Sequence, residues 1–424
     1  MMTHRLVLRG FGRLGWPRNL VWAEIHCSSP TLGSFFMNIL YLTHTCPYPP
    51  NRGDRIRCYY ILKHLSQNYE LTLLYPVFDN QHDVCLEYLQ QYCKTVIPFK
   101  HHIFASYFSC FKAIFSNHPF SVSFFYSIML KKFIQQLSPD MTLVDCSTMA
   151  QYAFDMSCPK ILDFVDIDSQ KWNYFSSMAG FPYSSIYRIE SRRLAKFERF
   201  LANQFDYCLV TSSHEKSLLD NISHIKVLPN GVDQQYFSTQ HTPMHGSIIF
   251  TGVMNYFPNS DAVVHFHRHI FPLIKRQVPA AQFIIAGMHP TAQIRKLADR
   301  HTTVTGFIPD IRAYLSKAAV CVVPLRIAMG VQNKVLEAMA MGVPVVATSA
   351  ANRGINATHE REILVADEPE SFAAATTRLL TDQSLRDAIR ENAKQFIDQN
   401  FRWEKNLKRL DELIAEITRF SPIH

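Results

Sequence analysis

Short apolar runs that alternate with helix-patterned segments constrain the fold of this chain more than any other feature. The alternation begins at Asn38 and restarts after a polar break near Leu228. Strands that alternate with helices along a chain indicate a parallel sheet with helices on its faces. The first series reads NILYLT, ELTLLYP, MTLVDC, KILDFVD and DYCLVT, and the second reads SIIFTG, QFIIAG, VCVVPL and VPVVAT. The sequence therefore predicts an α/β protein with two doubly wound domains.

Turn residues indicate where these two domains meet. The segment LPNGVD brings Pro, Asn-Gly and Asp into one short span, and a polar stretch continues from it as far as Gly246. A length of 424 residues also fits two domains of ordinary size. The predicted parts are a first domain over 37–228, a linker over 229–246, a second domain over 247–400, and a C-terminal helix over 401–424 that packs back toward the first domain.

The first 36 residues differ from the rest of the chain, because they show no strand or helix period. Arg5, Arg9, Arg13 and Arg18 interrupt any apolar core of a signal peptide in this segment. We expect residues 1–36 to be a loosely structured extension or an over-extended start, with the folded protein beginning at Met37.

Composition excludes several classes of protein. The chain is 47% hydrophobic and 18% charged, which is typical of a compact globular protein rather than a disordered one. Its net charge of +8 comes without long Lys and Arg clusters, so we expect anionic small ligands or an anionic membrane surface as partners and no nucleic acid. Ten cysteines without a CxxC pair indicate reduced thiols in the cytoplasm.

One stretch raises the question of membrane contact. No apolar run approaches the roughly 20 residues that a membrane-spanning helix needs. However, HHIFASYFSCFKAIFSNHPFSVSFFYSIMLKK, residues 101–132, combines many aromatic residues with basic ones. Such a segment fits either peripheral contact with the cytoplasmic leaflet or buried helices of the first domain.

Ligands of parallel sheets bind outside the carboxyl ends of the strands, so the loops there hold the candidate residues. The loop THTCPYPPNRGDRIR comes directly after the first predicted strand. In it Arg52 and the backbone at Gly53 can hold an anion, and Asp54 can cap a helix that begins at Arg55. The other interpretation is a plain capped turn.

His44 and Asp166 are the other candidates in the first domain. His44 directly follows the first strand, where it either hydrogen-bonds a substrate and relays a proton or is an incidental polar residue. Asp166 ends a later strand, where it suits contact with an acceptor hydroxyl. Asp166 and Asp168 form a D-x-D pattern, but two carboxylates alone make a poor magnesium site, so no metal is predicted. Trp172 and Tyr174 form either a sugar-stacking wall or part of the core.

The second domain offers backbone donors at its strand ends. Gly252 ends a strand and Asn255 lies near the next helix start, so both are expected to face the cleft. Gly306 and Phe307 lie in a loop before a short helix, where contact with a nucleobase is expected. For Phe307 the alternative is packing.

The stretch RIAMGVQNKVLEAMAMGVP, residues 326–344, carries the most specific pattern. Arg326 and Lys334 bring two cations near a helix N-terminus, and Gly330 removes the side chain where an anion would approach. A diphosphate is the ligand that such a site fits. Glu337 lies one turn into the helix and suits a pair of ribose hydroxyls. A solvated surface helix is the alternative, which the apolar neighbours of Glu337 disfavour because a buried unpaired carboxylate is costly.

On these residues the chain resembles a known family. GVQNKVLEAMAMGVPVVA, residues 330–347, resembles the donor-site segment of the retaining glycosyltransferases of family 4, whose fold is GT-B. TGFIPDIRAYLSKAAVCVVPL and PNGVD match the same pattern, and the resemblance covers 37 to about 420. More narrowly, ILYLTHTCPYPPNRGDRIR, VDIDSQKW and RIAMGVQNKVLEAMAMG resemble the exosortase/PEP-CTERM-associated sugar transferases of bacterial exopolysaccharide loci.

The chain departs from the family at one position. The usual E-x7-E pair would end at Glu337 and begin at position 329, where this chain has Met329. The loop backbone around Val331 and the amides of Gln332 or Asn333 are expected to take over sugar contact. The family's Arg-Lys phosphate pair is not recognisable after Gly252, so Arg326 and Lys334 are the better candidates for binding the phosphates.

The resemblance implies transfer of a sugar from a nucleotide diphosphate sugar, as co-substrate, to a glycan or lipid-linked acceptor, with retained configuration. No other cofactor is expected, and the protein is expected in the cytoplasm or on the inner face of the plasma membrane. The residues expected to take part in catalysis are Arg326, Lys334, Glu337, Asp166 and His44. A nucleotide-sugar epimerase on the same fold and a non-catalytic nucleotide-sugar-binding scaffold remain alternatives.

Overall fold

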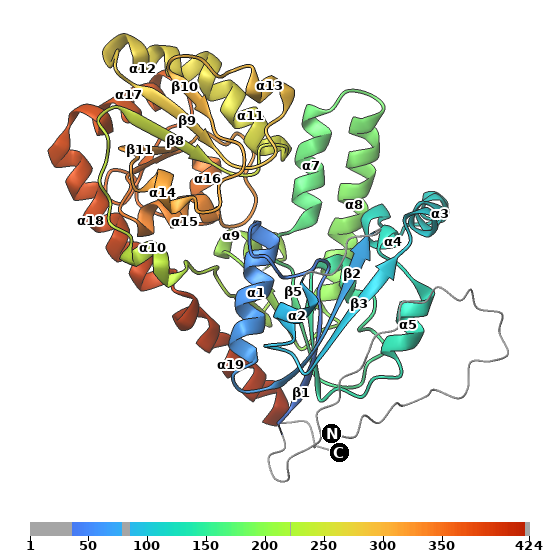
Figure 1. The fold of residues 1–424 in the computed structure, drawn as a ribbon. Coiled ribbons are helices and arrows are strands. Elements are labelled where there is room, and N and C mark those ends of the chain that lie inside the picture. Colours follow the sequence, from blue (N-terminus) through green and yellow to red (C-terminus); the bar gives the residue numbers. More distant parts are fainter. Residues whose placement is uncertain (1–35, 79–84, 221, 420–424) are drawn as a thin grey trace. The chain divides into compact units, whose positions relative to one another are not determined.

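The structure is a computed structural model that describes residues 36–78, 85–220 and 222–419 (Figure 1). The expected extension over 1–36 therefore lies almost wholly outside the described residues. Among the described residues, none of the helices is both long enough and apolar enough to cross a membrane.

The first lobe is built on a sheet of seven parallel strands in the order β3-β2-β1-β4-β5-β6-β7. The strands are β1 (Asn38–Leu42), β2 (Glu70–Phe78), β3 (Thr95–His101), β4 (Met141–Asp145), β5 (Lys160–Asp163), β6 (Tyr207–Val210) and β7 (Ile225–Val227). The helices are α1 (Gly53–Leu65), α2 (Leu86–Leu89), α3 (Ile103–Ile114), α4 (Phe120–Phe124), α5 (Ile128–Ile134), α6 (Ser147–Ala150), α7 (Asp168–Met178), α8 (Tyr183–Ala202) and α9 (Ser213–Leu218). The short helix α10 (Gln234–Ser238) comes after β7, and its Tyr236 and Phe237 pack against the core of the second lobe.

The second lobe repeats this architecture with a sheet of six parallel strands in the order β10-β9-β8-β11-β12-β13. The strands are β8 (Ser247–Thr251), β9 (Gln282–Ala286), β10 (Thr302–Val304), β11 (Val320–Val323), β12 (Val345–Ala347) and β13 (Leu364–Val365). The helices are α11 (Phe257–His265), the π-helical turn η1 (Phe266–Ile270), α12 (Phe271–Gln277), α13 (Ala292–Arg295), α14 (Arg312–Leu315), α15 (Asn333–Ala340), α16 (Ser349–Asn352), α17 (Pro369–Thr381) and α18 (Gln383–Asn400). The last helix, α19 (Trp403–Arg419), follows the second lobe in the chain.

Apolar strands that are covered on both faces explain why the sheets are parallel. In β1, Ile39 and Tyr41 belong to one hydrophobic cluster, whereas Leu40 and Leu42 belong to another. Successive side chains of a strand point to opposite faces of the sheet, so the two clusters lie on the two faces of the first sheet. A parallel sheet needs this double cover because its connecting helices lie on both sides. The prediction of two doubly wound domains is thereby confirmed.

The C-terminal helix α19 completes the first lobe's core although it comes after the second lobe in sequence. Its residues Trp403, Leu407, Leu410 and Ile414 belong to the same cluster as β1's Ile39 and Tyr41. The Trp403 ring stacks on Tyr60 of α1 at 4.8 Å between centroids, and α19 runs beside α1 (Figure 1). The predicted domain boundaries stay predictions, because the packing does not fix them to a residue.

The helix after β1 begins earlier than the sequence indicated. It starts at Gly53 with Arg52 as its N-cap, and the Arg52 side chain makes no capping hydrogen bond. The prediction that Asp54 caps a helix beginning at Arg55 is therefore wrong. Asp54 lies inside the first turn, where its carboxylate pairs with Arg52 instead.

Both sheets reverse their strand order at one place, and there the loops of neighbouring strands diverge. In the first lobe this switch point lies between β1 and β4, and in the second between β8 and β11. Ligands of open parallel sheets bind at the carboxyl ends of the strands at such a point. The sequence candidates near β1, β8 and β11 thus lie where the fold favours a site.

Candidate functional site

Two glycines form the floor of the second lobe's switch point. Gly252 comes after β8 and Gly287 after β9, with φ of +157° and +147°. A Cβ on Gly287 would lie 1.8 Å from the carbonyl oxygen of Gly252, so the two backbones touch. Only glycine permits this close approach at Gly287. Neither Gly252 nor Gly287 has a side chain of its own, and the side chains of Asn259 and Lys334 approach Gly252 instead.

Lys334 lies beside this floor, in the first turn of α15. Its Nζ donates a hydrogen bond of 2.5 Å to Oδ1 of Asn259 and lies 4.3 Å from the centre of the Phe250 ring. A Cβ on Gly252 would be 3.1 Å from the same Nζ. Burial lowers the pKa of Lys334 to about 7. The charge of Glu337 acts against this shift without cancelling it, so a further anion beside the ammonium would favour its protonated form.

Glu337 lies three residues after Lys334, on the same side of α15. Burial raises the pKa of Glu337 to about 7, although Lys334 and a hydrogen bond with the Tyr236 side chain favour the charged form. A partly buried carboxylate with few partners can accept hydrogen bonds from a pair of hydroxyl groups. The pair at positions 334 and 337 thus offers a cation and an acceptor within one helical turn.

Arg326 has a different environment from the one expected. Its Nε donates to Asp261 at 2.9 Å, and a second guanidinium nitrogen pairs with the same carboxylate. The side chain is 47% exposed. Its backbone oxygen accepts a 2.5 Å hydrogen bond from the Tyr174 hydroxyl of α7. The charge of Arg326 is thus already paired, whereas that of Lys334 is not.

The loop before α15 packs against the first lobe. Gly330 has φ of +54°, and a Cβ there would lie 1.9 Å from Oδ1 of Asp166. The missing side chain therefore admits a carboxylate from the first lobe. The Gln332 amide nitrogen donates to the Met329 carbonyl at 2.7 Å, and Val331 is buried. The loop is held by its own hydrogen bond and by the packing of Val331.

A strained turn places the Asp166 carboxylate against Gly330. Val165 has φ of +62°, and the Asp166 N–H donates to the Phe164 carbonyl at 2.8 Å, so the turn reverses over three residues. Positive φ is unfavourable for a β-branched residue, and such strain costs about 1–3 kcal/mol. Burial raises the pKa of Asp166 to about 6. No pattern in the sequence indicated this turn.

Glu215 is a second carboxylate at this place that the sequence patterns did not reveal. It is 3% exposed and accepts hydrogen bonds from the backbone N–H and the hydroxyl of Thr211 and from the N–H of Ile167. Burial raises the pKa of Glu215 to about 8, and the charge of Asp166 adds to this. In the sequence, S-S-H-E indicates only an ordinary capped helix. Glu215 becomes a candidate site residue because it lies close to Asp166.

His44 is held between two carboxylates. Its Nδ1 bonds Asp145 and its Nε2 lies 3.6 Å from Asp54. Burial opposes the charged ring, yet Cys146, Asp145 and Asp54 raise the pKa of His44 well above its ordinary value. Both ring nitrogens therefore have partners and the imidazolium is favoured. This arrangement suits a fixed positive charge better than the predicted proton relay.

The loop over 52–54 lies against the second lobe. A Cβ on Gly53 would be 3.8 Å from the side-chain nitrogen of Asn333, the first residue of α15. Arg52 is 48% exposed and pairs with Asp54, so this arginine is reachable from solvent. The loop predicted for the acceptor and the helix predicted for the donor thus meet at Gly53 and Asn333.

A buried arginine that no sequence motif singled out links the two lobes. Arg57 is fully buried, donates to Asp163 at 2.6 Å and 3.1 Å, and donates to the Asn230 side-chain oxygen at 2.9 Å. Asn230 in turn donates to the side chain of Asn333 at 3.0 Å. One hydrogen-bonded row thus runs from β5 to the first residue of α15. Within the basic pattern RIRCYY, nothing distinguished Arg57 from its neighbour Arg55.

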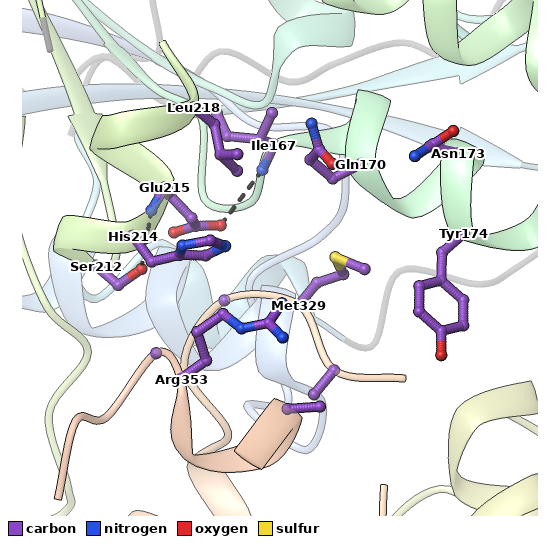
Figure 2. A pocket seen from close by; sticks show the side chains of 14 residues that line it. Ile167, Gln170, Asn173, Tyr174, Ser212, His214, Glu215, Leu218, Met329 and Arg353 are labelled. Atoms are coloured by element: carbon purple, nitrogen blue, oxygen red, sulfur yellow. Dashed lines mark hydrogen bonds between the residues drawn. The ribbon is translucent and has the colours of Figure 1, made fainter. Parts of the chain in front are cut away.

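A cavity of about 100 Å³ lies where α7 and α9 meet the loops of the second lobe (Figure 2). In Figure 2, Met329 and Arg353 extend into it from the second lobe toward α7 and α9. Tyr174 lines this cavity, whereas Trp172 packs against the first lobe's core. Ligand pockets usually measure about 300–1,000 Å³, so this cavity fits part of a ligand and not a whole nucleotide sugar.

The remaining donor candidates are open to solvent. Asn255 is exposed, Phe307 is 69% exposed, and Gly306 has φ of +70° with no atom within 4 Å of an added Cβ. The alternative that Phe307 packs in the core is excluded by this exposure. Its ring is available for contact with a base.

One group of side chains has the composition of a metal site. Ligand atoms of His44, Asp145 and Cys146 lie within 4.8 Å of one another. Imidazole, carboxylate and thiolate are all zinc ligands, but His44 and Asp145 already bond each other. Asp168 of the D-x-D pattern pairs with Lys171 at 2.5 Å. The expectation that no metal takes part stays a prediction.

Comparison with known proteins gives a family match in the second lobe. Residues 245–382 match the model described as Glycosyl transferases group 1. A Bacillus subtilis (strain 168) protein named "Putative glycosyltransferase YtcC" is 29% identical over 187 residues, which are 40% of this chain and 45% of that protein. This chain thus spans less than half of that relative. An uncharacterised 44.6 kDa protein in the cps region of Klebsiella pneumoniae is 20% identical over 389 residues, 86% of this chain and 96% of that protein.

Solved structures show the same fold over nearly the whole chain. Anabaena Alr3699/HepE in complex with UDP is 15% identical with a TM-score of 0.65, over 90% of this chain and 100% of that one. The same protein in complex with UDP-glucose gives a TM-score of 0.63 at 15% identity over the same shares of each chain. The chain therefore has the GT-B fold, and its second lobe carries the segment that matches the group 1 glycosyl transferases.

Proposed function

We propose that this protein is a retaining glycosyltransferase of family 4 that moves a sugar from a nucleotide diphosphate sugar to a glycan or lipid-linked acceptor. The observation that carries the proposal is the pair Lys334 and Glu337 on the first turns of α15, at the switch point of the second sheet. The group 1 match over 245–382 supports the same reaction class.

In this proposal the second lobe binds the donor. The diphosphate lies over Gly252 and beside Lys334, where the α15 N-terminus adds partial positive charge. Glu337 accepts hydrogen bonds from the ribose hydroxyls, and Phe307 and the backbone at Gly306 face the base. Because Alr3699/HepE was solved with UDP and UDP-glucose, UDP-sugars are the first donors to test.

The chemistry depends on where charge develops. As the bond between the sugar and the diphosphate breaks, negative charge grows on the leaving phosphate, and a fixed cation lowers the energy of that state. Lys334 supplies this cation, and protonation on donor binding gives it full charge. Without a metal, removing such a group from this kind of site costs about 10²–10³-fold in rate.

The first lobe provides the acceptor side. Asp166, which lies against Gly330, is ionised above about pH 6 by its pKa and can then accept a hydrogen bond from an acceptor hydroxyl. His44 contributes a fixed positive charge, and Arg52 with the loop at Gly53 and Asp54 faces the acceptor. Met329 points into the cavity where the family's sugar-holding glutamate is absent, so backbone groups of the loop at Val331 and the amides of Gln332 and Asn333 hold the donor sugar.

The biological setting is part of the same proposal. We place the enzyme in exopolysaccharide or cell-surface glycan synthesis, on the cytoplasmic side, and among the exosortase-associated transferases. The relative from a cps region of Klebsiella pneumoniae supports this setting. A lipid-linked acceptor would bring the protein into peripheral contact with the membrane.

A thermal-shift panel of UDP, GDP, ADP and CMP sugars identifies the donor, and acceptor-dependent release of the nucleotide from that donor then tests transfer. We expect release with the wild type and with Lys408→Ala, an exposed control on α19, and loss with Lys334→Ala. Isomerised sugar nucleotide from donor alone would identify an epimerase. Donor binding without turnover on any acceptor would identify a scaffold.

A further inference from the structure

Helix α3 presents its large apolar residues to solvent. Phe104, Tyr107, Phe108 and Phe111, together with Phe115 at the C-cap, recur at the three- and four-residue spacing of one helical face, and they are 58–91% exposed. We call these five residues the aromatic face of α3. An apolar stripe on a surface helix normally points into the core, so the orientation of α3 is the reverse of the usual one.

The opposite side of α3 is small and polar, and it is the side that contacts the protein. Ser106 and Ala113 are its buried residues. The Ser106 hydroxyl lies 2.7 Å from Nε2 of His101, and the Cys110 thiol lies 3.4 Å from the Phe120 carbonyl. The inner side of α3 is thus made of small residues, and its large aromatic residues lie on the outer side.

The orientation of α3 is fixed by α8. Arg193 of α8 donates to the carbonyls of Ala113 and His118, at 2.8 Å and 3.2 Å. Glu190 of α8 is 2% exposed and accepts from the N–H groups of Phe120 and Ser121 at the start of α4. The aromatic face is therefore a held surface and not the side of a loosely attached helix.

The segment that carries this face is basic. No Asp or Glu occurs between Lys94 and Asp140, and Lys100, Lys112 and Lys132 are exposed, whereas Lys131 is paired with Asp155 at 2.8 Å. The Lys112 ammonium lies 4.7 Å from the centre of the Phe108 ring, at the edge of the aromatic face. Aromatic rings with lysines at their border are typical of helices that lie in the interface of an anionic bilayer.

We infer that the aromatic face of α3 docks the first lobe on an anionic membrane surface. A second copy of the chain fits less well, because a two-fold dimer would set this face and its lysines against the same lysines. This inference rests on the proposed function, because a lipid-linked acceptor would lie at such a membrane surface. The sequence left membrane contact and burial open for residues 101–132, and the exposure of α3 excludes burial for the aromatic face.

Co-sedimentation of the full chain with vesicles tests this directly. Vesicles of phosphatidylcholine alone are compared with vesicles that also contain phosphatidylglycerol, at low and high salt. We expect binding to the anionic vesicles that weakens with salt. The double variant Phe104→Ser/Phe111→Ser should bind at least about tenfold more weakly, because two rings no longer enter the interface. Met244→Ser, an exposed apolar control just before β8, should bind like the wild type.

Three results would overturn the inference: no wild-type binding to anionic vesicles at low salt, equal binding by the double variant, or a wild-type dimer in sedimentation velocity that the double variant abolishes. The rings are exposed, so the variant should keep the wild-type melting temperature. Vesicle binding needs no donor, and nucleotide binding is measured separately on the same samples. A failed transfer reaction with intact vesicle binding would therefore overturn the proposed function and leave the docking surface standing.

Discussion

The two lobes share a topology, but they differ in how the charged side chains at their switch points are paired. At the first, between β1 and β4, His44 bonds Asp145, and nearby Arg57 bonds Asp163 inside the core. At the second, between β8 and β11, Lys334 bonds an amide oxygen and lies over an aromatic ring, and among the described residues it forms no ion pair, although the charge of Glu337 acts on it. The first switch point is thus neutralised by the protein's own charges, whereas in our proposal the second is completed by the donor.

The largest expected effect tests whether the buried ion pair of Arg57 with Asp163 stabilises the first lobe. Arg57→Ala should lower the free energy of unfolding by about 3–5 kcal/mol, because it leaves the fully buried Asp163 without its partner. Denaturant unfolding followed by circular dichroism measures this. Arg52→Ala removes an ion pair with a 48% exposed arginine and should cost no more than about 1 kcal/mol. Equal effects of the two variants would contradict the comparison.

In the second lobe, loss of a buried cation should reduce activity rather than stability. Lys334→Ala should leave the unliganded protein as stable as the wild type or more stable, because burial of this ammonium is unfavourable. The same change should lower kcat/KM by about 10²–10³-fold, since the leaving diphosphate loses its cation. Melting curves and steady-state transfer assays measure the two effects. A large loss of stability with little loss of turnover would make Lys334 a structural residue.

The contact between the lobes can be tested at Gly330. Gly330→Ala places a Cβ against Asp166 at φ of +54°, and a left-handed conformation costs an L-residue about 1–2 kcal/mol. Unfolding experiments should show a larger loss than that, because the Cβ would also lie 1.9 Å from the Asp166 carboxylate oxygen. Gly306→Ala is the matched control, because Gly306 has φ of +70° and an added Cβ there meets no atom within 4 Å. Partial rescue of the Gly330 variant by Asp166→Gly would identify the contact, and no rescue would leave backbone conformation as the sole cause.

The smallest expected effect is a pH dependence. Lys334 has a folded pKa of about 7, below its ordinary value, so nucleotide binding above pH 7 must include proton uptake. The affinity for UDP should fall by up to about tenfold per pH unit above 7 from this cause. Ionisation of Glu337, whose pKa is also about 7, acts in the other direction. Calorimetric titration of Lys334→Arg, which stays charged, separates the two, and an unchanged pH profile in this variant would contradict the role of Lys334.

Periodicity sufficed to predict the sheets and helices, because buried parallel strands are continuous apolar runs. It also placed Lys334 and Glu337 near a helix start, since that pattern is local in sequence. It failed wherever a partner comes from far along the chain. Nothing in VDID indicated that Val165 adopts positive φ and directs Asp166 toward Gly330.

Two further features depended on tertiary contacts in the same way. Arg57 is significant through Asp163 and Asn230, which lie 106 and 173 residues away. The outward aromatic face of α3 results from the bonds of Arg193 and the small residues of its inner side. A helical period predicts one apolar face, but it does not say whether that face meets the core or the surroundings.

The central claim is that Lys334 completes its charge with the diphosphate of the donor. Carbon-13 NMR of lysine side chains, with Lys334→Arg to assign the signal, monitors its titration with and without UDP. We predict a pKa of about 7 in the free protein and a clear rise when UDP binds. A titration that is the same with saturating UDP would contradict the claim.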